Sequence, residues 1–290
     1  MFDVYLQALI SGLMIGGVYA LVAVGLTLIF GVMDIINFAH GEFLMFGMYA
    51  SFFASMLFGI DPYFTVILAL PIFFALGWFI QGTLIRPVVG KSHAIQILLT
   101  LGLSLFMQAL AQFLFSADFQ SLKLDYGTST FEVGGARVSY TKLAAFAISV
   151  GMCGALWLFL QRTDTGKALR ACAEEHEGSL AVGIDLGRMY KIAFGLGIAC
   201  VAIAGVAMTP FFYVAPVVGP KFTLVAFVIV VLGGLGNIPG AVAGALIVGV
   251  VESVGALVMP SPSLKDLAVY MLFILVLLFR PQGLFGGKGA

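Results

Sequence analysis

Long apolar runs separated by short polar stretches dominate the chain. Seven runs without Asp, Glu, Lys or Arg are each about as long as a bilayer-spanning helix, which needs about 20 apolar residues: Val4–Met33, Phe43–Ile60, Pro62–Ile85, Ser92–Ala117, Leu143–Gln161, Ile192–Pro220 and Phe222–Val251. A shorter run, Leu267–Phe279, lies between Asp266 and Arg280. The pattern predicts an all-α polytopic membrane protein with about eight or more transmembrane helices, because a lipid-facing β-barrel would show short alternating segments instead.

Composition supports this class and narrows the chemistry. The chain is 61% hydrophobic and 10% charged, whereas soluble domains carry about 25% charged residues. Its net charge of zero predicts no nucleic-acid partner. Cys153, Cys172 and Cys200 lie too far apart for a disulfide framework or a metal site.

No catalytic motif is visible either. The GKS at Gly90–Ser92 lacks the upstream glycine of a phosphate-binding loop, because Ile85 stands there. There is no HExxH and no GxSxG motif. We therefore expect a chain that is not an enzyme and holds no metal or cofactor. Any energy for transport comes from a coupled ion or from another polypeptide.

Charge asymmetry assigns the two sides of the membrane. The loop 162–191 carries five Lys or Arg residues among its many charges, and the positive-inside rule places it in the cytoplasm. Residues 118–142 and the N-terminus are then extracytoplasmic, and the C-terminal segment from Arg280 is cytoplasmic. Ser129–Tyr140 reads as a β-hairpin around two glycines. We expect residues 1–290 to form one transmembrane domain.

The stretch Gly31–Phe43 (GVMDIINFAHGEF) interrupts the apolar pattern with Asp34, Asn37, His40 and Glu42. Ionisable groups inside a bilayer cost about 2.5–3.5 kcal/mol each on insertion scales and usually face one another or a water-filled path. Two interpretations stay open. The stretch is either a turn at the cytoplasmic surface or an interrupted helix whose polar groups line a path near mid-membrane.

A second interruption favours the path. Gly233–Ala241 (GGLGNIPGA) divides the run Phe222–Val251 and places Asn237 beside glycines, as the first break does with Asn37. Interrupted segments in corresponding positions of two halves are typical of a substrate site. Gln108 either bridges helices or faces the same path.

The cytoplasmic loop reads as more than a connector, since helix connections usually take about 2–8 residues. We expect Thr165 to cap a short helix with Ala168, Leu169 and Cys172 on one face and Gly178 at its end. A second turn, Ser179–Val182, would stop at Gly183, and the next helix would start from Asp185. The alternatives are a solvated connector and a docking surface for a soluble partner.

The quoted motifs resemble the permeases of Liv-type ABC importers, the high-affinity branched-chain amino-acid transport family. INFAHGE (Ile36–Glu42) carries the likeness, which continues through RPV (Arg86–Val88), LGLSLFMQ (Leu101–Gln108), GKALRACAEEHEGSLAVGI (Gly166–Ile184), LVAFVIVVLGGLGNIPGAVAGALIVGVVES (Leu224–Ser253) and LLFRPQGLFG (Leu277–Gly286). It covers nearly the whole chain and is weakest in the loop 118–142.

This resemblance implies an H-type permease subunit, similar in fold to the ribose-type importers, in the bacterial inner membrane. Its partners would be an M-type permease, two cytoplasmic ATPases that bind ATP and Mg, and a periplasmic substrate-binding protein. The cargo would be leucine, isoleucine, valine or a related small substrate.

The resemblance also assigns roles to residues. The loop element that inserts into the ATPase would include Thr165, Gly166, Leu169, Arg170, Glu174, Ala181 and Gly183. Residues expected along the substrate path are Asn37, Phe38, His40, Glu42, Gln108, Phe227 and Asn237. Apart from the resemblance, an alternative role for Asp34 and Glu42 in place of ligand contact is to hold helix ends, a carboxylate at a helix N-terminus being favoured by about 0.3–1 kcal/mol.

Two other functions fit the same polar residues. A proton-coupled secondary transporter would use Asp34, His40 and Glu42 as a relay. A passive channel for a small neutral solute would need no energy source. Transport by this chain alone would distinguish both from an ATP-driven importer.

Overall fold

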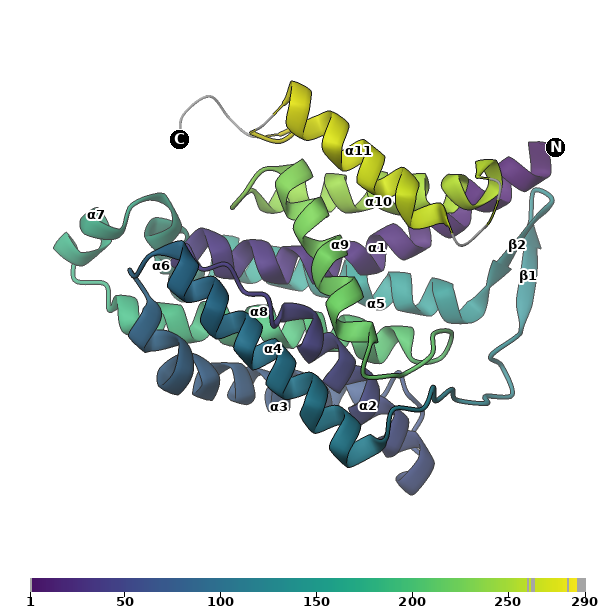
Figure 1. Ribbon diagram of the computed structural model, residues 1–290, viewed down its shortest axis with the longest axis horizontal. Coiled ribbons are helices and arrows are strands. Elements are labelled where there is room, and N and C mark those ends of the chain that lie inside the picture. The colour runs from purple at the N-terminus through teal and green to yellow at the C-terminus, as the bar shows by residue number, and fades with distance from the viewer. Residues whose placement is uncertain (1, 260, 262–263, 281, 286–290) are drawn as a thin grey trace.

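The computed structural model describes residues 2–259, 261, 264–280 and 282–285. Its helices are α1 Phe2–Met33, α2 His40–Phe58, α3 Thr65–Ile80, α4 His93–Phe115, α5 Tyr140–Arg162, α6 Asp164–Glu174, α7 His176–Ala181, α8 Leu186–Met208, α9 Val218–Gly233, α10 Ile238–Val258 and α11 Lys265–Phe279 (Figure 1). A π-helical turn, Gln81–Ile85, and a 3₁₀ turn, Arg86–Val88, follow α3. The expected hairpin is present as β1 Thr130–Val133 and β2 Ala136–Ser139.

Seven helices in the described part of the chain are long and apolar enough to cross a membrane: α1, α2, α3 with its continuation to Val88, α4, α5, α8 and α10. The predicted polytopic helical class is confirmed, although the count of eight spans is not. Helix α9 has only 16 residues and α11 only 15. The apolar run Ile192–Pro220 was expected to be one span, but α8 ends at Met208, just before Pro210, which has no backbone N–H to continue a helix.

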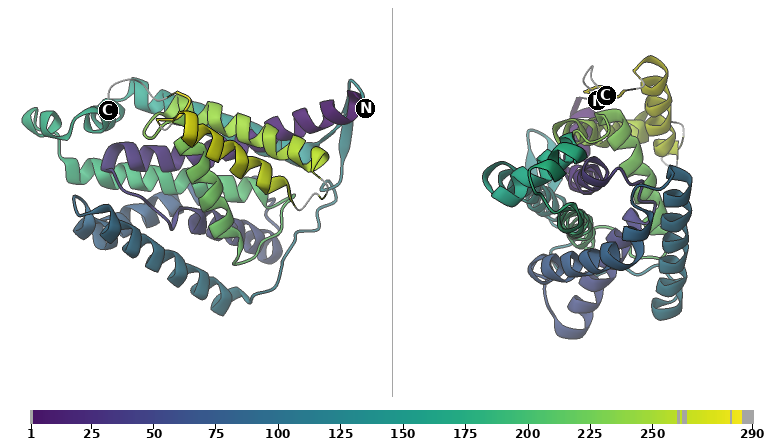
Figure 2. Two further views of the ribbon diagram at one scale, coloured as in Figure 1. Left: turned by 45° about the horizontal axis from the view of Figure 1, so that its top comes forward. Right: turned by 90° about the vertical axis from the view of Figure 1, so that its left-hand side faces the viewer.

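Helices α1 and α8 form the centre of the bundle. Most of the α8 side chains from Ala193 onward are buried, as are nearly all side chains of α1 between Val18 and Met33. The end-on view in Figure 2 shows the other helices arranged around them. Small residues permit the close packing, since a Cβ added at Gly249 of α10 would lie 2.6 Å from the Cα of Gly16.

The two ends of the molecule differ in charge and structure. One end, here called the inner end, carries α6, α7, the start of α8, the end of α3 and the α9–α10 turn (Figure 1). The loop cations that assign a cytoplasmic side therefore gather at one end. The N-terminus and the β1–β2 hairpin lie at the opposite, outer end, where the Gln7 side chain donates to the Arg137 carbonyl over 2.6 Å.

The loop before the hairpin is tied to the outer end by a tyrosine. The Tyr126 hydroxyl donates to the Asp61 carboxylate over 2.5 Å. Burial, reinforced by this hydrogen bond, holds the pKa of Tyr126 well above its usual value. Burial does the same to the pKa of Tyr63 nearby. Both phenols therefore stay neutral and act as hydrogen-bond donors.

Polar contacts hold both ends of helix α11 to α9 and α10. At the outer end, Lys265 donates to the buried Glu252 of α10, whose other oxygen accepts from the Tyr19 hydroxyl over 2.6 Å. Lys221 of α9 pairs with Asp266 over 3.4 Å. At the inner end, the Leu284 backbone N–H donates to the Leu232 carbonyl over 2.7 Å. These contacts join α9, α10 and α11.

The loop helices begin and end at other residues than the sequence predicts. Thr163, not Thr165, caps α6, because its extended backbone lets Oγ1 accept the Gly166 N–H over 2.9 Å. Helix α6 ends at Glu174 rather than Gly178, since Glu175 is extended, and α7 begins at His176 rather than Ser179.

Two other expectations for this loop are confirmed. Gly183 has φ +83°, which ends the segment. Asp185 caps α8 by accepting the Arg188 N–H over 3.1 Å. Of the cytoplasmic C-terminal segment that the charge pattern predicts, residues 281 and 286–290 lie outside the described residues.

The α1–α10 contact predicts a steric effect. Gly249→Leu should lower the unfolding free energy by about 1–3 kcal/mol or more, because overpacking forces the two backbones apart. Thermal unfolding in detergent, followed by circular dichroism, measures the change. Gly151→Leu is the matched control, because a Cβ there meets nothing within 4 Å. Equal unfolding midpoints for the two variants would contradict this packing.

Candidate functional site

The chain turns back into the bundle after α1. Asp34 is exposed at the inner end with φ +51°, and the next residues run along α1 until α2 starts at His40. The His40 Nε2 lies 3.0 Å from the Val22 carbonyl oxygen. About 16 Å of helical rise separates Val22 from Met33. Helix α2 therefore begins deep in the bundle, which favours the interrupted helix over the surface turn.

Side chains from three elements satisfy the backbone of this interruption. Asn37 Oδ1 accepts the Ala39 N–H over 3.1 Å. The Thr100 hydroxyl of α4 donates to the Ile36 carbonyl over 3.0 Å, and the Thr223 hydroxyl of α9 accepts the Gly41 N–H over 2.9 Å. Non-helical backbone at membrane depth is tolerated only with such protein partners.

The space beside Gly41 admits no side chain. A Cβ added there would lie 2.1 Å from the Gly219 carbonyl oxygen at the start of α9. The first turn of α2 is thus in direct backbone contact with α9.

A buried carboxylate joins α2 to α4. Glu42 is fully buried, and its Oε1 accepts from the Ser104 hydroxyl over 2.8 Å and from Gln108 Nε2 over 3.2 Å. Gln108 therefore bridges helices, one of the two expected roles. Sequence reasoning missed Ser104, although its place one turn before Gln108 on an apolar helix was a usable signal.

Three more polar atoms lie beside this network. Glu42 Oε2, Asn37 Nδ2 and His40 Nδ1 are buried and have no hydrogen-bond partner among the described residues. Next to them the half-buried rings of Phe38 and Phe227 lie with centroids 4.9 Å apart. Six of the seven predicted path residues therefore converge where α2 begins, a region called here the α2 entry.

Asn237, the seventh predicted path residue, lies elsewhere. Its Oδ1 accepts the Gly240 N–H over 3.0 Å and caps α10, and its Nδ2 donates to the Phe285 carbonyl over 2.9 Å. The second interruption is a tight turn between α9 and α10 at the inner end, opposite Gly31. The expectation that the two breaks line one path is wrong in this respect, because Asn237 is needed at a helix end.

Asp34 is also separate from His40 and Glu42. It is exposed, and its carboxylate lies 4.0 Å from His93 Nε2 at the inner end. The three groups of the hypothetical proton relay are therefore not brought together.

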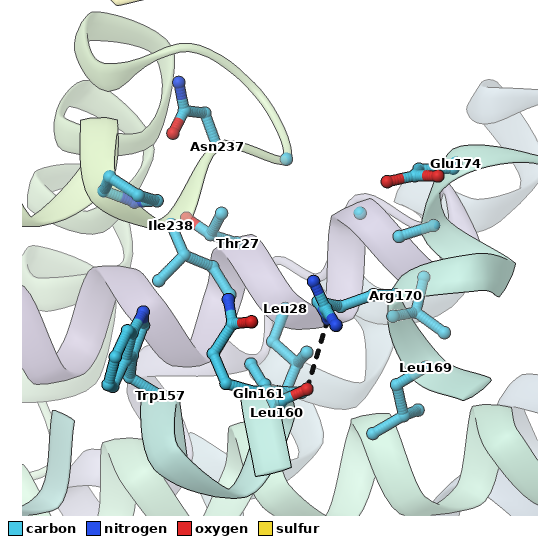
Figure 3. A pocket seen from close by; sticks show the side chains of 15 residues that line it. Thr27, Leu28, Trp157, Leu160, Gln161, Leu169, Arg170, Glu174, Asn237 and Ile238 are labelled. Atoms are coloured by element: carbon cyan, nitrogen blue, oxygen red, sulfur yellow. Dashed lines mark hydrogen bonds between the residues drawn. The ribbon is translucent and has the colours of Figure 1, made fainter. Parts of the chain in front are cut away.

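The α9–α10 turn faces the loop helix α6 across an open pocket of about 300 Å³, here called the inner-end pocket (Figure 3). Asn237 lies on one side, and Arg170 and Glu174 lie on the other. Arg170 Nε donates to the Leu160 carbonyl over 3.1 Å. The pocket thus combines a residue expected on the path with residues expected to couple to an ATPase.

The other predicted coupling residues have different places. Leu169 is buried and also lines the pocket. Gly166 packs on α5, where an added Cβ would lie 2.3 Å from the Phe159 carbonyl oxygen. Thr165 is half-buried near the start of α6, whereas Ala181 and Gly183 are exposed at the end of α7 and beyond it.

Sequence reasoning missed two lining residues of the inner-end pocket. Trp157 and Gln161 of α5 lie beside it, one helical turn apart (Figure 3). A tryptophan and an amide at i,i+4 spacing near the end of an apolar run were the available signal.

Neither region holds a cluster that would bind a metal. The described residues contain no group of three or more His, Cys, Asp or Glu side chains placed to hold an ion. Cys153, Cys172 and Cys200 are free thiols, and burial raises the pKa of the Cys172 thiol. The chemistry available at the α2 entry is hydrogen bonding and apolar contact.

The Thr223–Gly41 hydrogen bond predicts a local change. Thr223→Val should leave the buried Gly41 N–H without a partner, at a cost of about 1–3 kcal/mol, and loosen the start of α2. Faster hydrogen exchange in peptides covering residues 36–44 measures it. Thr223→Ser keeps a hydroxyl and should exchange like the parent. Unchanged exchange in Thr223→Val would remove this hydrogen bond from the account.

With this geometry in view, comparison with known proteins gives a consistent result. Residues 8–277 match the model of a family described as the permease component of a branched-chain amino acid transport system. The chain is 34% identical to the high-affinity branched-chain amino acid transport system permease proteins BraD of Pseudomonas aeruginosa and LivH of Escherichia coli, over 97% of this chain and 96% of each relative. A probable LivH of Methanocaldococcus jannaschii is 28% identical over 92% of this chain and 88% of the relative. No solved structure matches the chain significantly.

Proposed function

The chain belongs to the family of branched-chain amino acid transport system permease components, and on that premise we propose that it is the H-type subunit of an ATP-driven importer of leucine, isoleucine and valine or a related small substrate. The observation that carries the proposal is the match to such permeases over nearly the whole chain. As a permease the chain is a transport subunit and not an enzyme. Its family favours an ATP-driven importer over the secondary transporter and the passive channel.

Permeases of this family act within ABC transport systems, so ABC partners are implied. We propose the particular set that consists of an M-type permease, a periplasmic substrate-binding protein and two cytoplasmic ATPases that carry ATP and Mg. The chain would be one multi-pass permease domain in a bacterial inner membrane. From its zero net charge we expect no nucleic-acid partner.

The α2 entry is the proposed contact with the cargo. Phe38 and Phe227 provide an apolar wall for an aliphatic side chain. Asn37 Nδ2 and His40 Nδ1, which lack partners among the described residues, offer transient hydrogen bonds to a zwitterion. Glu42 is engaged with α4 and so positions the entry. Such contacts bind weakly, which suits a path from which cargo must leave.

The inner-end pocket and α6–α7 are the proposed site of coupling to the ATPases. A partner that presses on Arg170, Glu174 or Ala181 pushes α6 toward the α9–α10 turn. Asn237 lies in the turn that follows the inner end of α9, whereas Thr223 lies in the outer half of α9 and accepts the Gly41 N–H at the start of α2. A shift of α9 therefore changes the packing of the α2 entry, which is a bistable element of the kind that a transport cycle needs.

Reconstitution tests the proposal directly. Liposomes containing the chain with its M-type partner, both ATPases and the binding protein should accumulate leucine against its concentration gradient. This uptake should require ATP on the side of the membrane where the ATPases lie. Liposomes with this chain alone should show no uphill uptake, with or without a proton gradient. Uphill uptake by the chain alone would overturn the assignment.

Coupling at α6–α7 makes a separate prediction. The double variant Arg170→Glu/Ala181→Trp should lose most of its co-purifying ATPases, because it reverses a charge and adds bulk on the docking surface. Both side chains are exposed, and Arg170→Glu removes one hydrogen bond, that to the Leu160 carbonyl, so the fold should persist; circular dichroism melting checks this.

Lys123→Glu provides the control for that double variant. Lys123 is exposed on the outer loop, away from α6 and α7, and should retain the full ATPase complement. If the double variant retained it as well, the docking surface would lie elsewhere.

A further inference from the structure

A second pocket at the inner end has no part in the functions above. It has a volume of about 470 Å³ and lies between the end of α3 and the start of α8. Its lining residues are Trp78, Arg86, Asp185, Gly187, Arg188 and Lys191. None of these residues lines the inner-end pocket or belongs to the α2 entry. The pocket is called here the α3–α8 pocket.

The α3–α8 pocket has an excess of positive charge. It is lined by three cations, Arg86, Arg188 and Lys191, and by one carboxylate. That carboxylate, Asp185, is already engaged as the cap of α8. None of the three cations forms an ion pair with any described residue. The pocket therefore presents unpaired positive charge that an anionic ligand could bind.

An aromatic ring forms part of the same pocket. Lys191 Nζ lies 5.6 Å from the centroid of the Trp78 ring, within the range of a cation–π interaction. Tryptophan is enriched where a membrane protein passes from hydrocarbon to headgroups. Lys191 is likewise the last charge before the apolar run of α8. The pocket thus lies at the boundary between the two layers.

The surface beside the pocket is apolar and exposed. Phe79 is 64% exposed and Leu84 is 44% exposed on the same helical segment as Trp78. The π-helical turn Gln81–Ile85 follows, and such turns are frequent at functional sites. Its last residue, Ile85, is fully buried and anchors the turn directly before Arg86, which is exposed. A ligand here meets cations and an acyl-chain surface at once.

We propose that the α3–α8 pocket binds the headgroup of an anionic phospholipid from the inner leaflet. Arg86, Arg188 and Lys191 contact the phosphate, and Trp78 packs against the glycerol region. Basic pockets between transmembrane helices on the cytoplasmic side recognise anionic headgroups in this way. A soluble phosphate would use the cations but not the exposed apolar surface next to them, and an acidic protein segment would not need the tryptophan.

Fluorescence quenching by brominated lipids tests the proposal, because the chain has only two tryptophans. In a Trp157→Phe background, Trp78 is the sole reporter. In mixed bilayers, brominated phosphatidylglycerol should quench Trp78 with a relative association constant at least about fivefold above that of brominated phosphatidylcholine, which corresponds to one cation near an anionic headgroup.

The double variant Arg86→Gln/Arg188→Gln should lower that preference at least about fivefold relative to the parent, because it removes two of the three cations and leaves only Lys191. Both side chains are exposed, and Lys191 stays to keep the surroundings of Trp78 unchanged. The matched control is Lys91→Gln/Arg162→Gln, which removes two cations from the same end but none from the pocket. This control should keep the preference.

Several outcomes would overturn the proposal. One is equal quenching of the parent by the two lipids, and another is a preference that is undiminished in Arg86→Gln/Arg188→Gln. Loss of the preference in the control pair would show a general effect of charge. Competition by free inorganic phosphate would assign the pocket to a soluble anion. Loss of the phosphatidylglycerol preference when the ATPases bind would assign it to a protein contact.

Discussion

A polypeptide that leaves the helical conformation inside a membrane must find partners for its exposed peptide groups within the protein. Side chains supply such partners to the segment between α1 and α2. Asn37, Thr100 and Thr223 supply its hydrogen bonds, and His40 reaches the carbonyl of Val22 on α1. One short stretch of irregular backbone is therefore in hydrogen-bonding contact with α1, α4 and α9.

The same requirement explains why polar residues are scarce elsewhere yet concentrated here. Glu42 bears a group that is costly to bury, and two donors on α4 offset the cost at its Oε1. The close backbone contact at Gly41 and Gly219 brings α9 near enough for Thr223 to participate. The polar residues at the start of α2 therefore lie beside the rings of Phe38 and Phe227. The α2 entry thus offers both hydrogen-bonding groups and an apolar surface.

Most of the helices could be predicted from the sequence, because the thickness of a bilayer sets the length of a charge-free apolar run. The break between α1 and α2 could be predicted as well, because polar residues interrupt the apolar pattern there. The sequence did not allow the correct cap of α6, since Thr163 and Thr165 both have the chemistry of a cap and only the tertiary position of Gly166 against α5 selects the first. It also placed Asn237 with Asn37, although the first break runs from the inner end into the bundle as far as His40 and the second stays at the inner end. Ser104 and Trp157 were missed for a related reason. The role of a single polar or aromatic residue on an apolar helix can be assigned only when its neighbours in space are known.

The contacts that hold α11 to α9 and α10 at both ends affect how these helices can move. Ion pairs at the outer end and the Leu284–Leu232 hydrogen bond at the inner end make α9, α10 and α11 a three-helix slab. Any movement of α9 then carries α10 and α11 with it, so it must shift both the α1–α10 packing at Gly16 and Gly249 and the Thr223–Gly41 hydrogen bond to α2.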